Sequence, residues 1–258
     1  MQDYGLVTVI TPSYNTARFI AETIRSVQAQ TYPNWEMIIV DDCSSDDTDG
    51  VVAPFLEQDE RIRYVKNAQN SGAAVSRNKA LRMARGKWIA FLDSDDVWMP
   101  EKLEHQLRFM VENHYHFSYH EYEEMDEDSV STGVKVSGIK KISKYQMYAF
   151  CWPGCLTVMY DRESLGELQI YDIKKNNDYA MWLKLIPKAD CYLVSESLAS
   201  YRRGRKGSVS SHGYFTLVKW HYKLWKQAME MNIIAALFWT GVNLVFGFYK
   251  KIRFISKR

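Results

Sequence analysis

Short apolar runs alternate with segments of helical periodicity along the first part of the chain, and this alternation limits the possible folds more than any other feature. Four runs have the length and the β-branched or aliphatic character of buried strands. They are residues 7–11, 36–40, 61–65 and 88–92. Strands that alternate with helices predict an α/β fold, in which a mostly parallel sheet is flanked by helices on both faces.

Turn and capping signals place the helices around these strands. A helix is predicted over residues 73–84 with Gly86 as its C-cap, and Pro100 suits the first turn of the next helix. The acidic segment 120–129 predicts a surface hairpin, to which we assign no chemistry.

Acidic side chains gather where two of the predicted strands end. Asp41 and Asp42 follow the second strand, and Asp93, Asp95 and Asp96 follow the fourth. Ligands of parallel sheets bind at the carboxyl ends of the strands, so both clusters are expected to share one crevice. Capping of the next helix is the alternative for such a turn. Three neighbouring carboxylates repel one another unless a cation neutralises them, which predicts Mn²⁺ or Mg²⁺ held together with a diphosphate.

Composition excludes several classes of protein. The 258 residues are 47% hydrophobic, enough for one large domain with an appendage. Formal net charge is +2, and because the last nine residues hold five basic and no acidic side chains, residues 1–249 carry −3. A nucleic-acid partner is therefore not expected. The four cysteines lack metal-ligand spacing, and the N-terminus lacks a signal-peptide pattern.

Six stretches together resemble glycosyltransferase family 2, the inverting enzymes of the GT-A fold that use nucleotide-diphosphate sugars. The stretches occur in the order and spacing of that family over about 210 residues, which is far more specific than a lone DxD. They are TPSYN (11–15), SVQAQTYPNWEMIIVDDCSSDDT (26–48), NSGAAVSRNKAL (70–81), GKWIAFLDSDDVWMPEKL (86–103), NNDYAMWLKL (176–185) and YRRGRKGSVS (201–210).

The resemblance implies a domain layout and a donor site. Residues 1–212 would form the Rossmann-like GT-A catalytic domain, with a nucleotide-sugar half (1–100) and an acceptor half (101–212), and residues 213–258 a helical extension. The positions that match donor-binding residues are Pro12, Tyr14, Asp42, Arg77, Asp93, Ser94 and Arg205.

Individual roles follow from the same resemblance. Tyr14 would stack on the nucleobase and Asp42 would accept a base N–H; a strand-end aromatic and a helix cap are the alternatives. Arg77 would contact the diphosphate or the sugar, unless it is an ordinary solvated helical arginine. Asp93 would lie beside the ribose, and Asp95 would be the metal ligand.

The resemblance assigns the catalytic base to Asp178. Inverting transfer is a single displacement, which needs a carboxylate on the acceptor side to take the hydroxyl proton. N-terminal capping of its helix is the alternative for Asp178. The family carries a Glu where Asn177 stands, and this departure removes one charge from the site.

Two further segments are ambiguous. Many family members carry a His at the position of Gly204, so the third metal or diphosphate ligand is in doubt, and Arg205, Lys206 or His212 would have to compensate. The basic loop is either a lid over the diphosphate or a solvated surface loop. Trp152, in FCWPGCLT, is either an acceptor platform for a sugar ring or a packing residue.

The C-terminal part predicts association with a membrane. Residues 233–249 are almost wholly apolar over 17 positions and are followed by basic residues, which suits the cytoplasmic face of the inner or plasma membrane. A helical hairpin that packs on the domain, or on a second copy in a homo-oligomer, is the alternative. A lipid-linked glycan acceptor fits the membrane hypothesis.

The sequence therefore predicts metal-dependent, inverting transfer of one hexosyl or N-acetylhexosaminyl unit, favouring a UDP-sugar, in the synthesis of O-antigen, capsule or lipopolysaccharide core. The QxxRW signature of processive synthases is absent, which favours single-sugar addition. GxGxxG and GxxxxGK[ST] are also absent, which argues against dehydrogenases and P-loop hydrolases. A catalytically silent, membrane-associated sugar-nucleotide-binding subunit remains the alternative.

Overall fold

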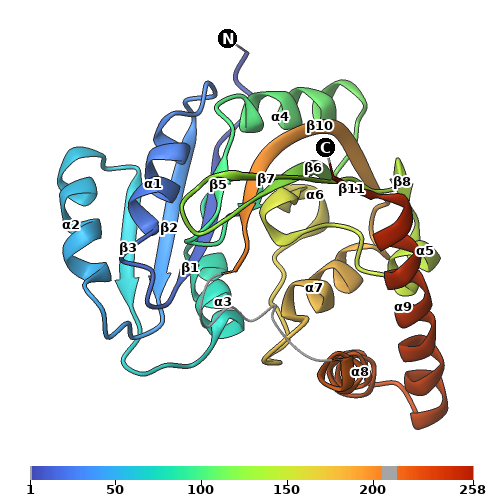
Figure 1. Cartoon of the computed structure of the whole chain (residues 1–258). Helices are drawn as coiled ribbons and strands as arrows, with labels where there is room; N and C mark the ends of the chain where they lie inside the picture. Colours follow the sequence, from blue (N-terminus) through green and yellow to red (C-terminus); the bar gives the residue numbers. More distant parts are fainter. Residues whose placement is uncertain (1, 205–213, 258) are drawn as a thin grey trace.

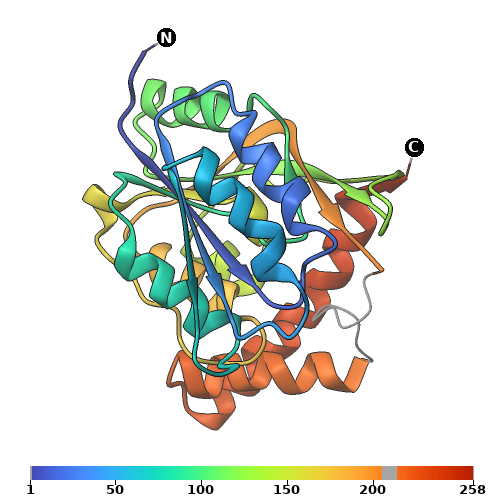
Figure 2. The ribbon, with the colours of Figure 1, turned by 90° about the vertical axis from the view of Figure 1, so that its left-hand side faces the viewer.

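The computed structural model describes residues 2–204 and 214–257 (Figures 1 and 2). The strands are β1 (Val7–Ser13), β2 (Trp35–Asp41), β3 (Ile62–Lys66), β4 (Trp88–Phe91), β5 (Val97–Trp98), β6 (Phe117–Met125), β7 (Ser131–Val136), β8 (Lys141–Ile142), β9 (Met159–Asp161), β10 (Cys191–Arg202) and β11 (Ile255–Lys257). The α-helices are α1 (Ile20–Gln28), α2 (Thr48–Gln58), α3 (Ala73–Met83), α4 (Lys102–Glu112), α5 (Lys144–Ala149), α6 (Arg162–Leu165), α7 (Asn177–Leu185), α8 (Tyr214–Lys223) and α9 (Ile233–Arg253).

One sheet connects these strands, in the order β11-β7-β6-β9-β4-β1-β2-β3, with β10 pairing to β5, β6 and β8. β1 is parallel to both β2 and β4, and β2 is parallel to β3, as the alternation of strands and helices predicts. The second half is mixed: β9 and β7 run antiparallel to β6, and only β10 lies parallel to it. The hairpin that joins β6 to β7 accounts for this, because a short turn can only connect antiparallel strands.

Side chains of the parallel strands alternate between two cores, as the period of two requires. Ile10, Ile38 and Phe91 face the core that α3 and α7 cover. Val9, Ile39 and Leu92 face the opposite core, which α1, α2 and α4 cover. Because both faces are covered, most side chains of β1, β2 and β4 are buried and apolar, and acidic side chains follow β2 and β4 at their carboxyl ends.

Gly86 has a different role from the predicted C-cap. Helix α3 ends at Met83, and the backbone N–H of Gly86 donates to the hydroxyl of Thr8 at 2.9 Å. A Cβ at Gly86 would lie 2.6 Å from the backbone nitrogen of Thr8. The glycine therefore permits the chain to pass close beside β1.

The C-terminal segment packs on the rest of the protein. Leu224, Trp225 and Ala236 belong to the same core as α3 and α7, and β11 pairs with β7. Figure 1 shows α9 along the edge of the molecule away from α1 and α2. The predicted boundary at residues 212 and 213 lies outside the described residues, as does Arg205.

Candidate active site

A tight acidic turn follows β4. The backbone N–H of Asp96 donates to the carbonyl of Asp93 at 3.0 Å, which folds the DxD segment back on itself. Asp96 is buried, and its carboxylate accepts the backbone N–H of Arg202 at 2.9 Å. Burial, together with the carboxylates of Asp95 and Asp93, raises the pKa of Asp96 well above its ordinary value. Three carboxyl groups therefore lie together at the carboxyl end of β4.

Arg77 links this turn to the start of α7. Its guanidinium forms an ion pair with Asp93 and donates to the side-chain oxygen of Asn177 at 2.7 Å. Arg77 is buried, so the structure does not support the alternative of a solvated helical arginine. Asn177, where family members carry a Glu, supplies a neutral acceptor to the same guanidinium.

Packing between α7 and β4 brings Asp178 to the acidic turn. Trp182 lies one helical turn after Asp178, and its ring contacts Phe91 edge-on with 5.2 Å between the centroids. Phe91 precedes Asp93 by two residues. Burial raises the pKa of the Asp178 carboxyl, and the nearby Arg77 charge opposes that rise. One Asp178 oxygen accepts the backbone N–H of Tyr179 at 2.8 Å, so the carboxylate also contacts the first turn of its helix.

The acidic turn after β4 and Asp178 of α7 open onto one cleft of about 260 Å³. Its lining consists of Asp93, Asp96, Tyr122, Gly154, Cys155, Leu156, Asp178, Tyr201 and Arg203. Sequence reasoning had assigned no role to the aromatic pair Tyr122 and Tyr201, whose rings lie 5.9 Å apart. Tyr201 lies in a stretch that matches the family, whereas no local pattern marks Tyr122.

Tyr14 and Asp42 lie at the neighbouring strand ends. The backbone N–H of Asp42 donates to the carbonyl of Ser13 at 2.8 Å, which places Asp42 beside the end of β1, where Pro12 is buried and Tyr14 is 44% exposed. Ser94 is buried within the acidic turn. These residues occupy the same edge of the sheet as the cleft, although Asp42 does not line it.

The Asp42 carboxylate orders the loop before α3. It accepts the backbone N–H groups of Ser71 and Gly72 at 2.9 and 2.6 Å, and the side-chain amide of Asn67 at 2.9 Å. Asp42 therefore holds the loop that leads into α3, but it does not cap the helix, because Ser71 and Gly72 precede its first residue, Ala73.

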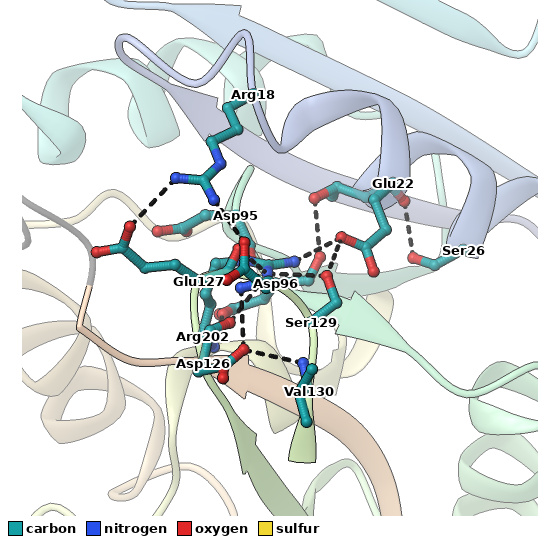
Figure 3. Close-up of polar contacts among 12 residues, drawn as sticks. Arg18, Glu22, Ser26, Asp95, Asp96, Asp126, Glu127, Ser129, Val130 and Arg202 are labelled. Carbon is teal, nitrogen blue, oxygen red and sulfur yellow. Dashed lines mark hydrogen bonds and ion pairs between the residues drawn. The ribbon is translucent and has the colours of Figure 1, made fainter. Parts of the chain in front are cut away.

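Arg202 of β10 holds the acidic turn in place through hydrogen bonds (Figure 3). Its Nε donates to the carbonyl of Asp95 at 2.8 Å, and one terminal nitrogen contacts Glu22 of α1 at 2.6 Å. The other terminal nitrogen donates to the carbonyls of Asp126 and Glu127 and to the Ser129 hydroxyl. The acidic hairpin tip thus has a structural role that its sequence did not indicate.

Trp152 is a packing residue, and the prediction that it forms an acceptor platform is wrong. Its side chain is only 3% exposed, its indole N–H donates to the carbonyl of Gln146 at 2.9 Å, and its ring packs edge-on against Phe150 and Phe254. No open ring face remains for a sugar, and the packing alternative holds. Residues 154–156, which follow it, do line the cleft.

The carboxylates suit a cation that takes its other ligands from a diphosphate. No cluster of three or more metal-binding side chains occurs within residues 2–204 and 214–257. Mg²⁺-type ions in phosphate sites need only one or two carboxylates from the protein. Asp95 is half-buried and lies between Asp93 and Asp96 in the turn, so a cation there would meet carboxyl oxygens from the protein.

These features define a class of protein: the fold is of the GT-A type, with a parallel first half, an acidic turn after β4 and a carboxylate from α7 in the same cleft. The family model "Glycosyl transferase family 2" matches residues 8–159, and the chain belongs to this family of glycosyltransferases, in which an inverting mechanism is typical.

Curated relatives cover most of the chain. It is 46% identical over 198 residues to the putative teichuronic acid biosynthesis glycosyltransferase TuaG of Bacillus subtilis, which covers 76% of this chain and 79% of TuaG. It is 39% identical over 215 residues to WfgD of Escherichia coli, named UDP-Glc:alpha-D-GlcNAc-diphosphoundecaprenol beta-1,3-glucosyltransferase, with 83% of each chain covered.

Solved structures share the fold. S. aureus TarS 1-349 in complex with UDP-GlcNAc matches 89% of this chain and 69% of its own, at a TM-score of 0.68 and 20% identity. The mannosyltransferase PcManGT of Pyrobaculum calidifontis, in complex with GDP-Man and Mn²⁺, matches 95% of this chain and 75% of its own, at a TM-score of 0.64 and 17% identity.

Proposed function

We propose that the protein transfers one hexosyl or N-acetylhexosaminyl unit, with inversion and with the help of a divalent cation, from a UDP-sugar to a lipid-linked glycan during synthesis of a bacterial surface polysaccharide. The observation that carries this proposal is the cleft that Asp93 and Asp178 both line, with the buried Arg77 paired to Asp93 and close enough to Asp178 to act on its charge.

The strand ends next to the cleft fit a nucleotide diphosphate. The exposed ring of Tyr14 provides a stacking face beside Asp42, which has the lone pairs to accept one further N–H from a base. Arg77 is buried and already held by Asp93 and Asn177, so its charge is fixed in place for the diphosphate or the sugar. UDP is favoured because the name of WfgD specifies UDP-Glc.

The acceptor half provides the base. Asp178 takes the proton from the attacking hydroxyl while the bond between the anomeric carbon and the diphosphate oxygen breaks, and the leaving diphosphate carries away the electron pair. Asp95, with Asp93 beside it, would hold Mn²⁺ or Mg²⁺, which when bound stabilises the negative charge of the leaving diphosphate. Asp178 at the start of α7 and Asp93 of the acidic turn both line the cleft, so a base and a donor-side carboxylate would be available in the same space.

The acceptor assignment rests on similarity and on the C-terminal segment. The name of WfgD specifies a diphosphoundecaprenol acceptor, and TuaG is named for teichuronic acid biosynthesis. Among the described residues, α9 is long and apolar enough to contact a bilayer. A location on the cytoplasmic face of the inner membrane is consistent with a lipid-linked acceptor and with the apolar helix α9.

Nucleotide sugars with Mn²⁺ are expected to raise the melting temperature. A ligand at 100 times its Kd adds about 2.7 kcal/mol, or about 5–10 °C for a chain of this size. UDP-glucose and UDP-GlcNAc should give shifts that fall when Mn²⁺ is omitted, and Asp95→Asn should lose the Mn²⁺-dependent part. A panel without any metal-dependent shift contradicts the proposed donor site. A normal shift without release of nucleoside diphosphate favours the silent-subunit alternative.

The pH dependence of transfer should depend on Arg77. Asp178 works as a base only when ionised, so activity falls as the pH drops through its pKa. Burial raises that pKa, which places the acid limb above the pH at which an ordinary Asp titrates, and the Arg77 charge lowers it again. Arg77→Gln should therefore move the acid limb to higher pH, whereas Arg77→Lys should keep it near the wild-type position. An unchanged limb in the Arg77→Gln profile would count against Asp178 as the base.

A further inference from the structure

The helix α9 has its polar and apolar faces reversed relative to a helix of a soluble protein. Its apolar side chains point outward: Ile234 is 82% exposed, Phe248 68% and Ile252 67%. Leu237, Phe238 and Val245 are exposed on the same side. These positions form a continuous stripe along the helix, because residues three, four and seven apart share a face.

Three polar side chains of α9, those of Thr240, Asn243 and Lys250, are buried against the protein, and each has a hydrogen-bond partner. The Asn243 amide donates to the carbonyls of Tyr148 and Ala149, both at 2.8 Å, and its oxygen accepts the indole N–H of Trp225 at 2.9 Å. Lys250 is buried and donates to the carbonyl of Trp152 at 2.6 Å. The inner face is therefore specific to this packing, and the outer face is suited to an apolar environment.

Both ends of α9 return to the body of the protein. Before the helix, the backbone N–H of Met231 donates to the carbonyl of Trp225 at 3.1 Å. After it, the carbonyl of Phe254 accepts from Ser137, and β11 pairs with β7. A 21-residue helix is long enough to cross a bilayer, but crossing would require these contacts and those of Asn243 and Lys250 to break.

The basic residues around α9 indicate that the membrane surface it contacts is anionic. Residues 214–257 contain seven Lys or Arg residues and one acid, Glu230. Lys251, Arg253 and Lys257 are exposed at the end of the apolar stripe. Basic side chains beside an exposed apolar face fit a leaflet that carries anionic headgroups, since apolar burial and attraction to the headgroups add.

We infer that α9 lies in the plane of an anionic membrane surface, with its outer apolar stripe in the lipid and its polar face on the protein, and does not span the bilayer. Lys250 contacts the carbonyl of Trp152, only two residues before Gly154 of the cleft lining. Docking therefore brings the acceptor side of the cleft close to the headgroups. That last step rests on the proposed function, whereas the docking itself does not.

Vesicle sedimentation tests the docking without any need for catalysis. The full-length protein should sediment with vesicles of phosphatidylcholine that contain phosphatidylglycerol. The double variant Ile234→Asn, Phe248→Asn should bind at least about 100-fold more weakly, because burial of each apolar side chain contributes about ten-fold or more. Lys251→Gln should lower binding about five-fold. Val130→Asn is the matched control, since Val130 is 60% exposed on the hairpin tip, and it should bind as the wild type does.

Depth measurements distinguish docking from spanning. Ile234, Gly241 and Phe248 lie seven residues apart on the exposed face, and each is changed to Cys and given a spin label in a Cys43→Ser, Cys151→Ser background. Docking in the plane predicts equal, shallow depths at all three positions. A deep label at position 241 between two shallow ones would mean that α9 spans, and overturns the inference. Labels that stay out of lipid while the protein dimerises in solution would assign the face to a second copy. Intact vesicle binding with no sugar transfer would refute the proposed function alone.

Discussion

Replacing Asp178 by Asn is expected to lower the rate of sugar transfer by about 10²- to 10⁴-fold, the usual contribution of a positioned general base. The Asn side chain keeps the shape of Asp, and its oxygen can still accept the Tyr179 N–H, so the start of α7 should not change. The loss should fall on kcat. Binding of UDP-glucose with Mn²⁺ should persist, because the residues proposed to bind the donor (Tyr14, Asp42, Asp93 and Asp95) are unchanged in this variant.

The rate is measured as release of UDP from UDP-glucose in the presence of a GlcNAc-diphosphate-lipid, the acceptor that the name of WfgD specifies. Asp172→Asn is the matched control, because Asp172 is an exposed carboxylate near α7 that does not line the cleft. Wild-type turnover by folded Asp178→Asn protein would remove Asp178 from the role of base.

The parallel half of the fold could be predicted because its signals are local. Each strand from β1 to β4 is a short segment rich in β-branched, aliphatic or aromatic residues, and the structure places all four within one or two residues of the predicted bounds. The positions of Asp42 and Asp93 at the carboxyl ends followed from the parallel arrangement. What Asp42 contacts did not follow, because its partners Ser71 and Gly72 lie 29 and 30 residues further along the chain.

The second half of the sheet and the supports of the site could not be predicted from local patterns. Arg202 contacts Asp95 and Glu22, which precede it by 107 and 180 residues, and no periodicity marks such pairs. Trp152 shows the opposite error: a Trp beside Pro and Gly suggested an exposed platform, but the helix α9, whose packing the local sequence does not reveal, covers it.

Arg202→Met is expected to lower the free energy of unfolding by about 3–5 kcal/mol, the usual cost of removing one partner from a buried network of charged hydrogen bonds. For a chain of this size the corresponding fall in melting temperature is about 10 °C. The side chain is almost fully buried, and the change would leave the carbonyls of Asp95, Asp126 and Glu127 without this donor. Arg202→Lys should recover little of the lost stability, because one ammonium group cannot make the several hydrogen bonds of the planar guanidinium.

Arg18 provides the matched control for Arg202. It contacts the same hairpin tip through Glu127 and Asp128, but its side chain is 57% exposed. Exposed ion pairs contribute about 0–1 kcal/mol, so Arg18→Met should melt within a few degrees of the wild type. Because Arg202 also holds the backbone of Asp95, Arg202→Met should weaken the Mn²⁺-dependent part of the UDP-sugar shift at temperatures where it is still folded. Equal melting temperatures for the two variants, with that shift intact, would show that the acidic turn does not depend on Arg202.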